Sequence, residues 1–427
     1  MKIIDGRNDP RCAEAIIARR WRMTVEIENR TTEIVAAVRR EGDEAVTTFT
    51  RQFDCRFIDS LGLRVSAREQ AAAYKSVSRK FLKALQLARK NITLFHQQQR
   101  PKSWVMKDKG LQLECRVSPL SRVGIVALGG KFACPSRVLT NAVPASIAGV
   151  KELVLVVQSN EEGKIAAETL VAAAECGVTE IYRIGGAQAV AALAFGTESI
   201  RRVDKIVGSG NAYVTAAKKA VFGEVGIDTI CEPAEVVIVA DEAANPAIIA
   251  ADILALAERG ETVFPVFLTS SSVLAQHVEL ELNIQVERIE RRVTAQRVLD
   301  QHGTIVIVES ARHAIDIVNK LTPASLVLMV KNGERISARV KNTGAIFIGE
   351  WSSYVMGDYL TGTNDSFPTA GSARFGSPIG VADFTKRTQV VNISKKRFQK
   401  LSMHAEVLAD AEGLQGGVAS LQRRANT

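Results

Sequence analysis

The sequence has no uninterrupted run of about 18 apolar residues, which is the length that a membrane-spanning helix needs. Its first residues, MKIIDGRNDPRC, carry charges where a secretory signal would need an apolar stretch. These two absences predict a cytoplasmic protein with no membrane partner. Cysteine is scarce as well: the six residues are scattered singly without CxxC spacing, and they indicate reduced thiols rather than a disulfide framework or a zinc knuckle.

Aromatic residues make up only 5% of the chain, but 46% of its 427 residues are hydrophobic, which is enough for two or three ordinary cores. The formal net charge is +9. The densest basic segments, residues 288–297 and 386–400, contain no zinc finger, RNP aromatic motif or basic zipper. We therefore interpret the excess charge as a solvated surface and expect no nucleic-acid partner.

The hydrophobic pattern predicts an α/β fold. Apolar residues recur at helical spacing over residues 76–99, within a first hundred residues that are helical in pattern. From residue 121 onward, short β-branched runs alternate with Ala-rich amphipathic stretches, which is typical of βα units in parallel sheets. The predicted strands form two groups, 123–128, 153–157, 181–184 and 205–207, and then 236–240, 263–268, 304–308, 326–329 and 345–348.

Three glycine-bearing turns follow strands of the first group, at residues 129–130, 185–186 and 208–210. A strand, a glycine turn and a helix amino terminus together favour phosphate binding through oriented backbone N–H groups. None of the three turns is GxGxxG, and each is equally consistent with a tight connection between strand and helix. A loop of some thirty residues rich in Gly, Ser, Thr and Pro follows residue 349, and loops of that length are usually functional.

Two segments carry a family resemblance, IGGAQAVAALAFGTESI at residues 184–200 and VDKIVGSGNAYVTAAKKAV at residues 203–221. The similarity continues through SRVGIVALGG, NAVPASIAGVKELVLV, AIFIGEWSSYVMGDYLTGTND and GVADFTKRTQVV. With these motifs the chain resembles histidinol dehydrogenase, the zinc enzyme that oxidises an amino alcohol through the aldehyde to the amino acid with two NAD. The resemblance spans nearly the whole chain.

The resemblance implies two doubly wound, Rossmann-like domains with a helical amino-terminal segment, a carboxyl-terminal tail and a domain-exchanged homodimer. Residues 1–25 would form an arm, residues 26–125 and 235–382 a discontinuous larger α/β domain, and residues 126–234 an inserted dinucleotide-binding domain. Residues 383–427 would form a tail that packs on the partner subunit.

For the cofactor, the resemblance implies that Gln188 and Asn211 contact NAD beside the Gly129–Gly130 turn. Both amides can donate and accept hydrogen bonds, as ribose hydroxyls and a carboxamide require. The alternative is that Gln188 caps a helix and Asn211 holds a turn. A third family contact, a tyrosine, is Val126 here, which predicts weakened binding.

The family's zinc ligands match Leu256, Arg259, Asp358 and Gly417, so that one of the four would survive. Zinc needs about three protein donors even at a catalytic site, and leucine and glycine supply none. The catalytic Glu-His pair matches Ala324 and Ser325, neither of which accepts a proton at neutral pH. The five histidines lie far apart in sequence, so the sequence predicts no zinc.

Acidic residues persist in the family's pocket. We expect Arg259 to take the place of zinc by pairing with Asp358, and these two residues, together with Glu412 of a partner tail, to bind substrate. Asp365 and Glu258 are the candidate bases. The alternative is that these carboxylates are solvated in an opened cleft.

The sequence therefore predicts an NAD(P)-linked oxidoreductase, with NAD as cofactor, that acts on a small polar substrate other than histidinol without zinc. The alternative is a non-catalytic family member that binds a small ligand or a protein partner. Histidinol oxidation itself is not expected, because the proton-transfer residues are replaced.

Overall fold

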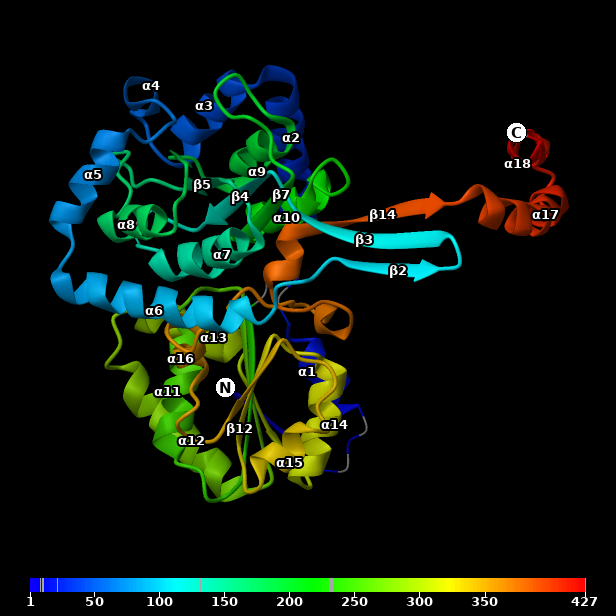
Figure 1. The fold of residues 1–427 in the computed structure, drawn as a ribbon. Helices are drawn as coiled ribbons and strands as arrows, with labels where there is room; N and C mark the ends of the chain where they lie inside the picture. The colour runs from blue at the N-terminus through cyan, green and yellow to red at the C-terminus, as the bar shows by residue number, and fades with distance from the viewer. Residues whose placement is uncertain (8, 10, 21, 131, 230–233, 427) are drawn as a thin grey trace. The chain divides into compact units, whose positions relative to one another are not determined.

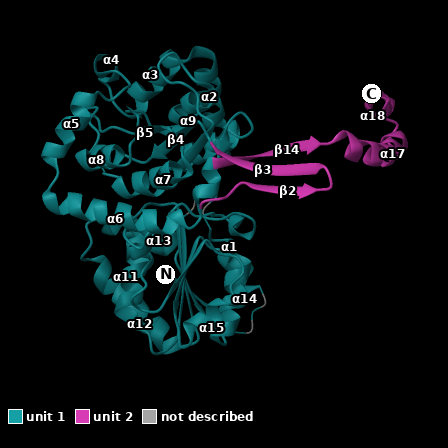
Figure 2. Ribbon diagram, in the orientation of Figure 1, with its two compact units in different colours: residues 1–99, 120–384 teal, residues 100–119, 385–427 magenta. Residues whose placement is uncertain are grey.

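The structure is a computed structural model that describes residues 1–427 except residues 8, 10, 21, 131, 230–233 and 427. In the described part of the chain the strands form three sheets (Figure 1). Two compact units are present: residues 1–99 and 120–384 form unit 1, and residues 100–119 and 385–427 form unit 2 (Figure 2).

The first sheet of unit 1 has five parallel strands in the order β6-β5-β4-β7-β8. Its strands are β4 (Arg122–Ala127), β5 (Glu152–Val157), β6 (Glu180–Tyr182), β7 (Lys205–Ser209) and β8 (Gly226–Ile227). The helices that connect them are α7 (Pro135–Ala148), α8 (Ala167–Glu175), α9 (Gly186–Phe195) and α10 (Ala212–Val221).

Alternate residues of the central strand β4 point to opposite faces, and each face has its own apolar core. Ile125 packs with α7, α8 and α6 (Arg79–Gln97), whereas Val126 packs with α9, α10 and α2 (Val25–Glu41). The remaining helices of the first hundred residues are α1 (Cys12–Ile17), α3 (Asp43–Phe53), α4 (Ile58–Leu61) and α5 (Ala67–Ser76). The sheet is therefore enclosed, as parallel sheets usually are.

The second sheet of unit 1 has six parallel strands in the order β1-β11-β10-β9-β12-β13. Its strands are β1 (Lys2–Asp5), β9 (Ala234–Ala240), β10 (Val263–Thr269), β11 (Thr304–Ile307), β12 (Ser325–Met329) and β13 (Ala345–Ile348). The helices of this part are α11 (Pro246–Ala257), α12 (Ser272–Val286), α13 (Arg292–Gln301), α14 (Ala311–Leu321), α15 (Gly333–Ser337) and α16 (Tyr354–Tyr359). Apolar cores again lie on both faces.

Unit 2 is an antiparallel sheet followed by two helices. The strand order is β14-β3-β2, with β2 (Trp104–Asp108), β3 (Leu111–Pro119) and β14 (Thr385–Ile393). The helices are α17 (Lys395–Ala411) and α18 (Gln415–Ala425), which pack against each other. Two segments far apart in sequence thus make one unit.

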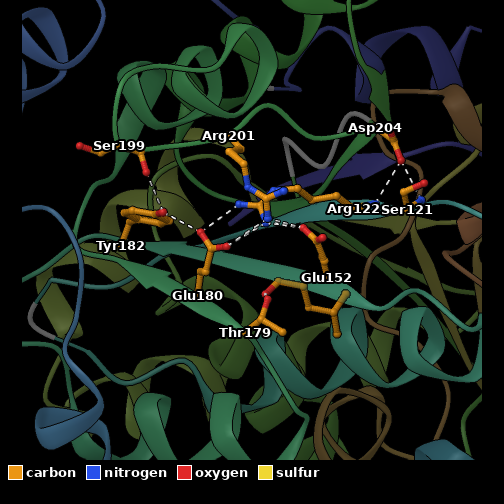
Figure 3. A network of polar contacts seen from close by, with 10 residues as sticks. Ser121, Arg122, Glu152, Thr179, Glu180, Tyr182, Ser199, Arg201 and Asp204 are labelled. Atoms are coloured by element: carbon orange, nitrogen blue, oxygen red, sulfur yellow. Dashed lines mark hydrogen bonds and ion pairs between the residues drawn. The ribbon is translucent and has the colours of Figure 1, made fainter.

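A charged network lies at the amino-terminal ends of β4, β5 and β6 (Figure 3). The buried guanidinium of Arg122 contacts carboxylate oxygens of Glu152 and Glu180 at 2.7 and 2.9 Å. Arg201 contacts Glu152 at 2.6 Å, and the Tyr182 hydroxyl donates to Glu180 at 2.7 Å. These pairs join three neighbouring strands at the sheet edge opposite their carboxyl ends.

The predicted α/β class with parallel sheets is confirmed. Each of the nine predicted strands occurs, eight with slightly shifted ends and residues 345–348 with the predicted ends. Five strands were not predicted: β1, β2, β3, β8 and β14. No helix in the described residues is long and apolar enough to cross a membrane. Five of the six cysteines are described and are free thiols, and Cys231 lies outside the described residues.

Candidate functional site

A pocket of about 270 Å³ opens beside the carboxyl ends of the five-stranded sheet. Gln188, from the first turns of α9, and Asn211, which precedes α10, both line it. The rest of the lining is Arg30, Ile34, Phe53, Asp54, Gln158, Gly186, Ala187 and Tyr213. In open α/β sheets, ligands bind at this edge where the strand order reverses, which here is between β4 and β7.

Gln188 is 1% exposed, and its side chain makes no cap to α9. Instead its amide nitrogen donates to Asp54 Oδ2 at 3.3 Å. Asn211 is the N-cap of α10, where its Oδ1 accepts from the backbone N–H groups of Tyr213 and Val214 at 3.1 and 3.2 Å. Asn211 therefore holds a turn and lines the pocket at once.

Asp54 was not predicted as a site residue. It follows α3 directly, and its carboxylate accepts from Gln158 Nε2 at 2.8 Å and from the Gly185 N–H at 3.2 Å, besides Gln188. Burial raises the pKa of Asp54 to about 6, against the opposing effect of the hydrogen bonds from Gly185 and Gln158. A carboxylate thus ties three pocket elements together.

The Gly129–Gly130 turn contacts the pocket lining through Gln158. The Gly130 N–H donates to the Gln158 carbonyl at 2.8 Å, and a Cβ at position 129 would lie 2.2 Å from that oxygen. A glycine is therefore required at position 129 for this close approach. Val126, which matches the family's tyrosine, is 2% exposed within the apolar core.

A second polar cluster brings Arg259, just beyond α11, onto Asp358 of α16. Their side chains form an ion pair, so the predicted pairing is confirmed. Arg259 also lies over the Tyr354 ring, 5.4 Å from its centroid. The Asp358 side chain is 10% exposed, and burial raises its pKa while Arg259 acts in the opposite direction.

Asp365 lies close enough to Asp358 for the two carboxylates to repel each other. The Asp365 side chain is 3% exposed, and its Oδ2 is 3.4 Å from Arg137 Nε, at the start of α7. Its second oxygen, Oδ1, is buried without a hydrogen-bond partner among the described residues.

The structure also describes two other predicted site residues, Glu258 and Glu412. Glu258 is the C-cap of α11 and is partly exposed, and its backbone carbonyl accepts from Arg291 at 3.2 Å. Arg291 in turn lies 3.8 Å from the centroid of the Phe132 ring. Glu412 follows α17 in unit 2 and is exposed.

The positions that match the family's zinc ligands do not form a ligand set on their own. Leu256 is 1% exposed in the apolar core of its sheet, Arg259 is bound to Asp358, and Gly417 is exposed in α18. Across the described residues, no group of three or more His, Cys, Asp or Glu side chains could hold a metal ion. These residues therefore do not fit zinc.

The histidinol dehydrogenase family model matches residues 18–425. The chain belongs to this family. Histidinol dehydrogenase 2 of Trichormus variabilis is 42% identical over 393 residues, which cover 92% of this chain and 91% of that protein. Histidinol dehydrogenase of Moorella thermoacetica is 42% identical over 99% of both chains. The crystal structure of histidinol dehydrogenase from Elizabethkingia anophelis matches with a TM-score of 0.92 and 31% identity, covering 99% of this chain and 98% of that one.

Two predictions from the sequence are wrong in the light of these relatives. The first is a substrate other than histidinol, with a non-catalytic role as its alternative, because full-length relatives at 42% identity are named histidinol dehydrogenase. The second is the absence of zinc, which conflicts with membership of a family of zinc- and NAD-dependent enzymes. Both predictions depended on a few positions that were matched to the family's motifs one at a time. Metal ligands and bases can be supplied instead by side chains that are distant in sequence and that the fold brings together.

Proposed function

We propose that this protein oxidises histidinol with NAD. The observation that carries the proposal is similarity along the whole chain, at 42% identity over 99% of its length, to a protein named histidinol dehydrogenase. In the reaction the primary alcohol passes a hydride to NAD⁺ and loses a proton to give the aldehyde. Water then adds to the aldehyde, a second hydride passes to a second NAD⁺, and the carboxylate and further protons are released.

The pocket beside the five-stranded sheet supports NAD as the cofactor. Gln188 and Asn211 offer amide groups that match ribose hydroxyls and a carboxamide, and the Gly129–Gly130 turn packs on the lining residue Gln158. A volume of about 270 Å³ is below that of a pocket enclosing a whole drug-sized ligand. We infer that one nucleoside half of the cofactor occupies this pocket.

The cluster around Asp358 and Asp365 supports an amino alcohol as substrate. Histidinol carries an ammonium group and an imidazole ring beside its alcohol, and carboxylates bind such groups. Arg259 neutralises Asp358 and would orient the alcohol or the carbonyl oxygen. We assign Glu412 of the partner tail to the same substrate.

For the base we favour Asp365 over Glu258, because Asp365 Oδ1 is buried and has no hydrogen-bond partner within the described part of the chain. In the family, zinc supplies Lewis acidity at the alcohol oxygen. The role we assign to Asp365 is to accept the proton of the alcohol or of the attacking water.

We also propose a homodimer in which residues 383–427 pack on the partner subunit. Large apolar side chains of unit 2 are exposed, among them Met403, Val407 and Leu408 at 65%, 68% and 67%. Exposed apolar surface of this kind marks an interaction site. For the domains we propose an inserted domain at residues 126–234 and a larger domain at residues 26–125 and 235–382. Residues 126–234 carry most of the five-stranded sheet and residues 235–382 most of the six-stranded sheet, which supports separating these two segments. Residues 26–125 supply helices α2 and α6, which pack on the five-stranded sheet.

The test is NADH formation from L-histidinol and NAD⁺ by the purified full-length protein, assayed with Zn²⁺ because the family's enzymes use it. We expect two NADH for each histidinol consumed and histidine as the product. Reactions without histidinol and reactions without NAD⁺ are the controls. If saturating histidinol and NAD⁺ give no NADH above these controls, the proposed function is wrong.

A further inference from the structure

Asp54 is the one carboxylate in the lining of the cofactor pocket as the described residues define it. Asp54 lies outside the glycine turns, because it directly follows α3. It contacts the turn at Gly185, more than a hundred residues later in the chain. One carboxylate oxygen accepts from Gln158, and the other accepts from the Gly185 N–H and from Gln188. Asp54 therefore bridges the strand ends of β5 and β6.

The hydrogen bond to Asp54 sets which end of the Gln188 amide is occupied. The amide nitrogen is directed to the carboxylate, so the carbonyl oxygen is the end left to accept from a ligand. This oxygen lies over Gly186, where a Cβ would be 2.7 Å away, so the glycine makes room for the amide. The hydrogen bond to Asp54 thus orients a buried amide on the pocket wall.

We propose that Asp54 is a positioning residue for the nicotinamide cofactor: its carboxylate fixes the Gln188 amide and the Gly185 N–H so that Gln188 presents its carbonyl oxygen to a ribose hydroxyl or to the carboxamide. This inference rests on the proposed NAD-linked function. Asp54 itself acts through Gln188 and the turn.

The electrostatics of the site support this role. A carboxylate removed from water is unfavourable unless it is paired or hydrogen-bonded, and Asp54 is compensated by three donors without a paired cation among its described contacts. Burial raises its pKa to about 6, and the hydrogen bonds from Gly185 and Gln158 act in the opposite direction by favouring the anion. Neutral hydrogen-bonding groups would be enough to hold α3 against the sheet. A carboxylate forms stronger hydrogen bonds and so orients the donors around it more firmly.

The competing explanation is purely structural, namely that Asp54 only ties α3 to the sheet. A double-mutant cycle separates the two. Titration calorimetry with NAD⁺ is carried out on the wild type, Asp54→Asn, Gln188→Ala and the combined variant. Asp59→Asn is the matched control, because it removes the same charge from an exposed residue that is paired with Arg51.

We expect Asp54→Asn to weaken NAD⁺ binding by about tenfold, as loss of hydrogen bonds to a charged group implies. In the Gln188→Ala background the same change should cost about twofold or less, because the amide that Asp54 positions is absent. The KM for NAD⁺ should rise while kcat changes little, and Asp59→Asn should bind as the wild type does.

Additive losses in the cycle, or equal losses in Asp54→Asn and Asp59→Asn, would overturn the positioning role while leaving NAD⁺ binding intact. If the wild type itself binds no NAD⁺, the proposed function and this inference both fall. Should Asp54→Asn fail to fold, Asp54→Glu replaces it in the cycle, because it keeps the charge but shifts the oxygens, and the same non-additivity is expected.

Discussion

Arg259, at the end of α11, forms an ion pair with Asp358 of α16. Two segments about a hundred residues apart are thereby joined beside the candidate substrate site. Because the Asp358 side chain is only 10% exposed, its charge depends on this partner.

The first prediction concerns that dependence. Arg259→Met should lower the free energy of unfolding by about 2–3 kcal/mol, because it leaves a buried carboxylate without its cation while Arg259 itself is partly exposed. The double variant Arg259→Met/Asp358→Leu should recover most of the loss, since both charges are then absent. Urea unfolding measures all three proteins. A double variant no more stable than Arg259→Met would contradict the pairing.

The second prediction tests Asp365 as the base. Asp365→Asn should lower kcat for histidinol oxidation by about a hundred- to ten-thousand-fold, the usual contribution of general acid–base catalysis. The Kd for NAD⁺ should stay unchanged, because Asp365 is not part of the cofactor pocket. Glu258→Gln is the matched control and should keep most of the activity. The reverse ranking would assign the proton transfer to Glu258.

The third prediction separates the two roles of Asn211. Asn211→Ala should lose both the helix cap, worth about 1 kcal/mol of stability, and the amide contact with the cofactor. Asn211→Asp keeps an oxygen for the cap but has no amide donor, so it should be as stable as the wild type and bind NAD⁺ more weakly. Melting curves measure the stability of each variant, and calorimetry measures its affinity for NAD⁺. Wild-type affinity in Asn211→Asp would limit Asn211 to holding its turn.

The fourth prediction concerns pH and the network in Figure 3. The hydrogen bonds from Arg122 lower the pKa of Glu180 from 4.5 to about 2. The folded state therefore favours the anion, and Glu180 contributes stability that is fully present above pH 4.5 and is lost as the pH falls towards 2. Relative to Glu180→Gln, the wild type should melt at a higher temperature at neutral pH, and the difference should shrink on acidification. A difference independent of pH would exclude the ionised pair.

The fifth prediction addresses the homodimer. Val407→Glu and Leu408→Glu place a charge on the exposed apolar side of α17 and should convert the dimer to monomers in light scattering, because an unpaired charge opposes burial at an interface. Gln399→Glu adds the same charge to an exposed polar position of the same helix and should remain dimeric. A monomeric wild type would refute the dimer.

The parallel sheets could be predicted from the sequence because buried parallel strands are nearly continuous apolar runs, as in ELVLVV of β5 and VFPVFLT of β10. The strands of unit 2 could not be, since β2 and β14 are mostly exposed and carry charged residues such as Lys107 and Arg387. β14 pairs with β3, and this pairing joins segments on either side of the largest part of the chain. Nothing local signals such a pairing.

The site was predicted unevenly for a similar reason. Gln188 and Asn211 lie in motifs next to glycine turns, and the Arg259–Asp358 pair followed from complementary charge at matched positions. Asp54 carries no motif, because its role arises from hydrogen bonds to Gly185 and Gln188 that the fold alone brings near. The one available signal was an acid directly after an amphipathic helix, which on most proteins is a solvated residue.

The edge strand β1 pairs with β11 in parallel register, Lys2 opposite Thr304. β1 therefore emerges from the ribosome long before its partner strand β11 has been synthesised. At roughly 5–20 residues per second, the interval is on the order of 15 to 60 seconds. Throughout that time the unpaired β1 segment displays the apolar pair Ile3 and Ile4, and the charges of Lys2 and Asp5 on either side hinder its pairing with strands of other chains.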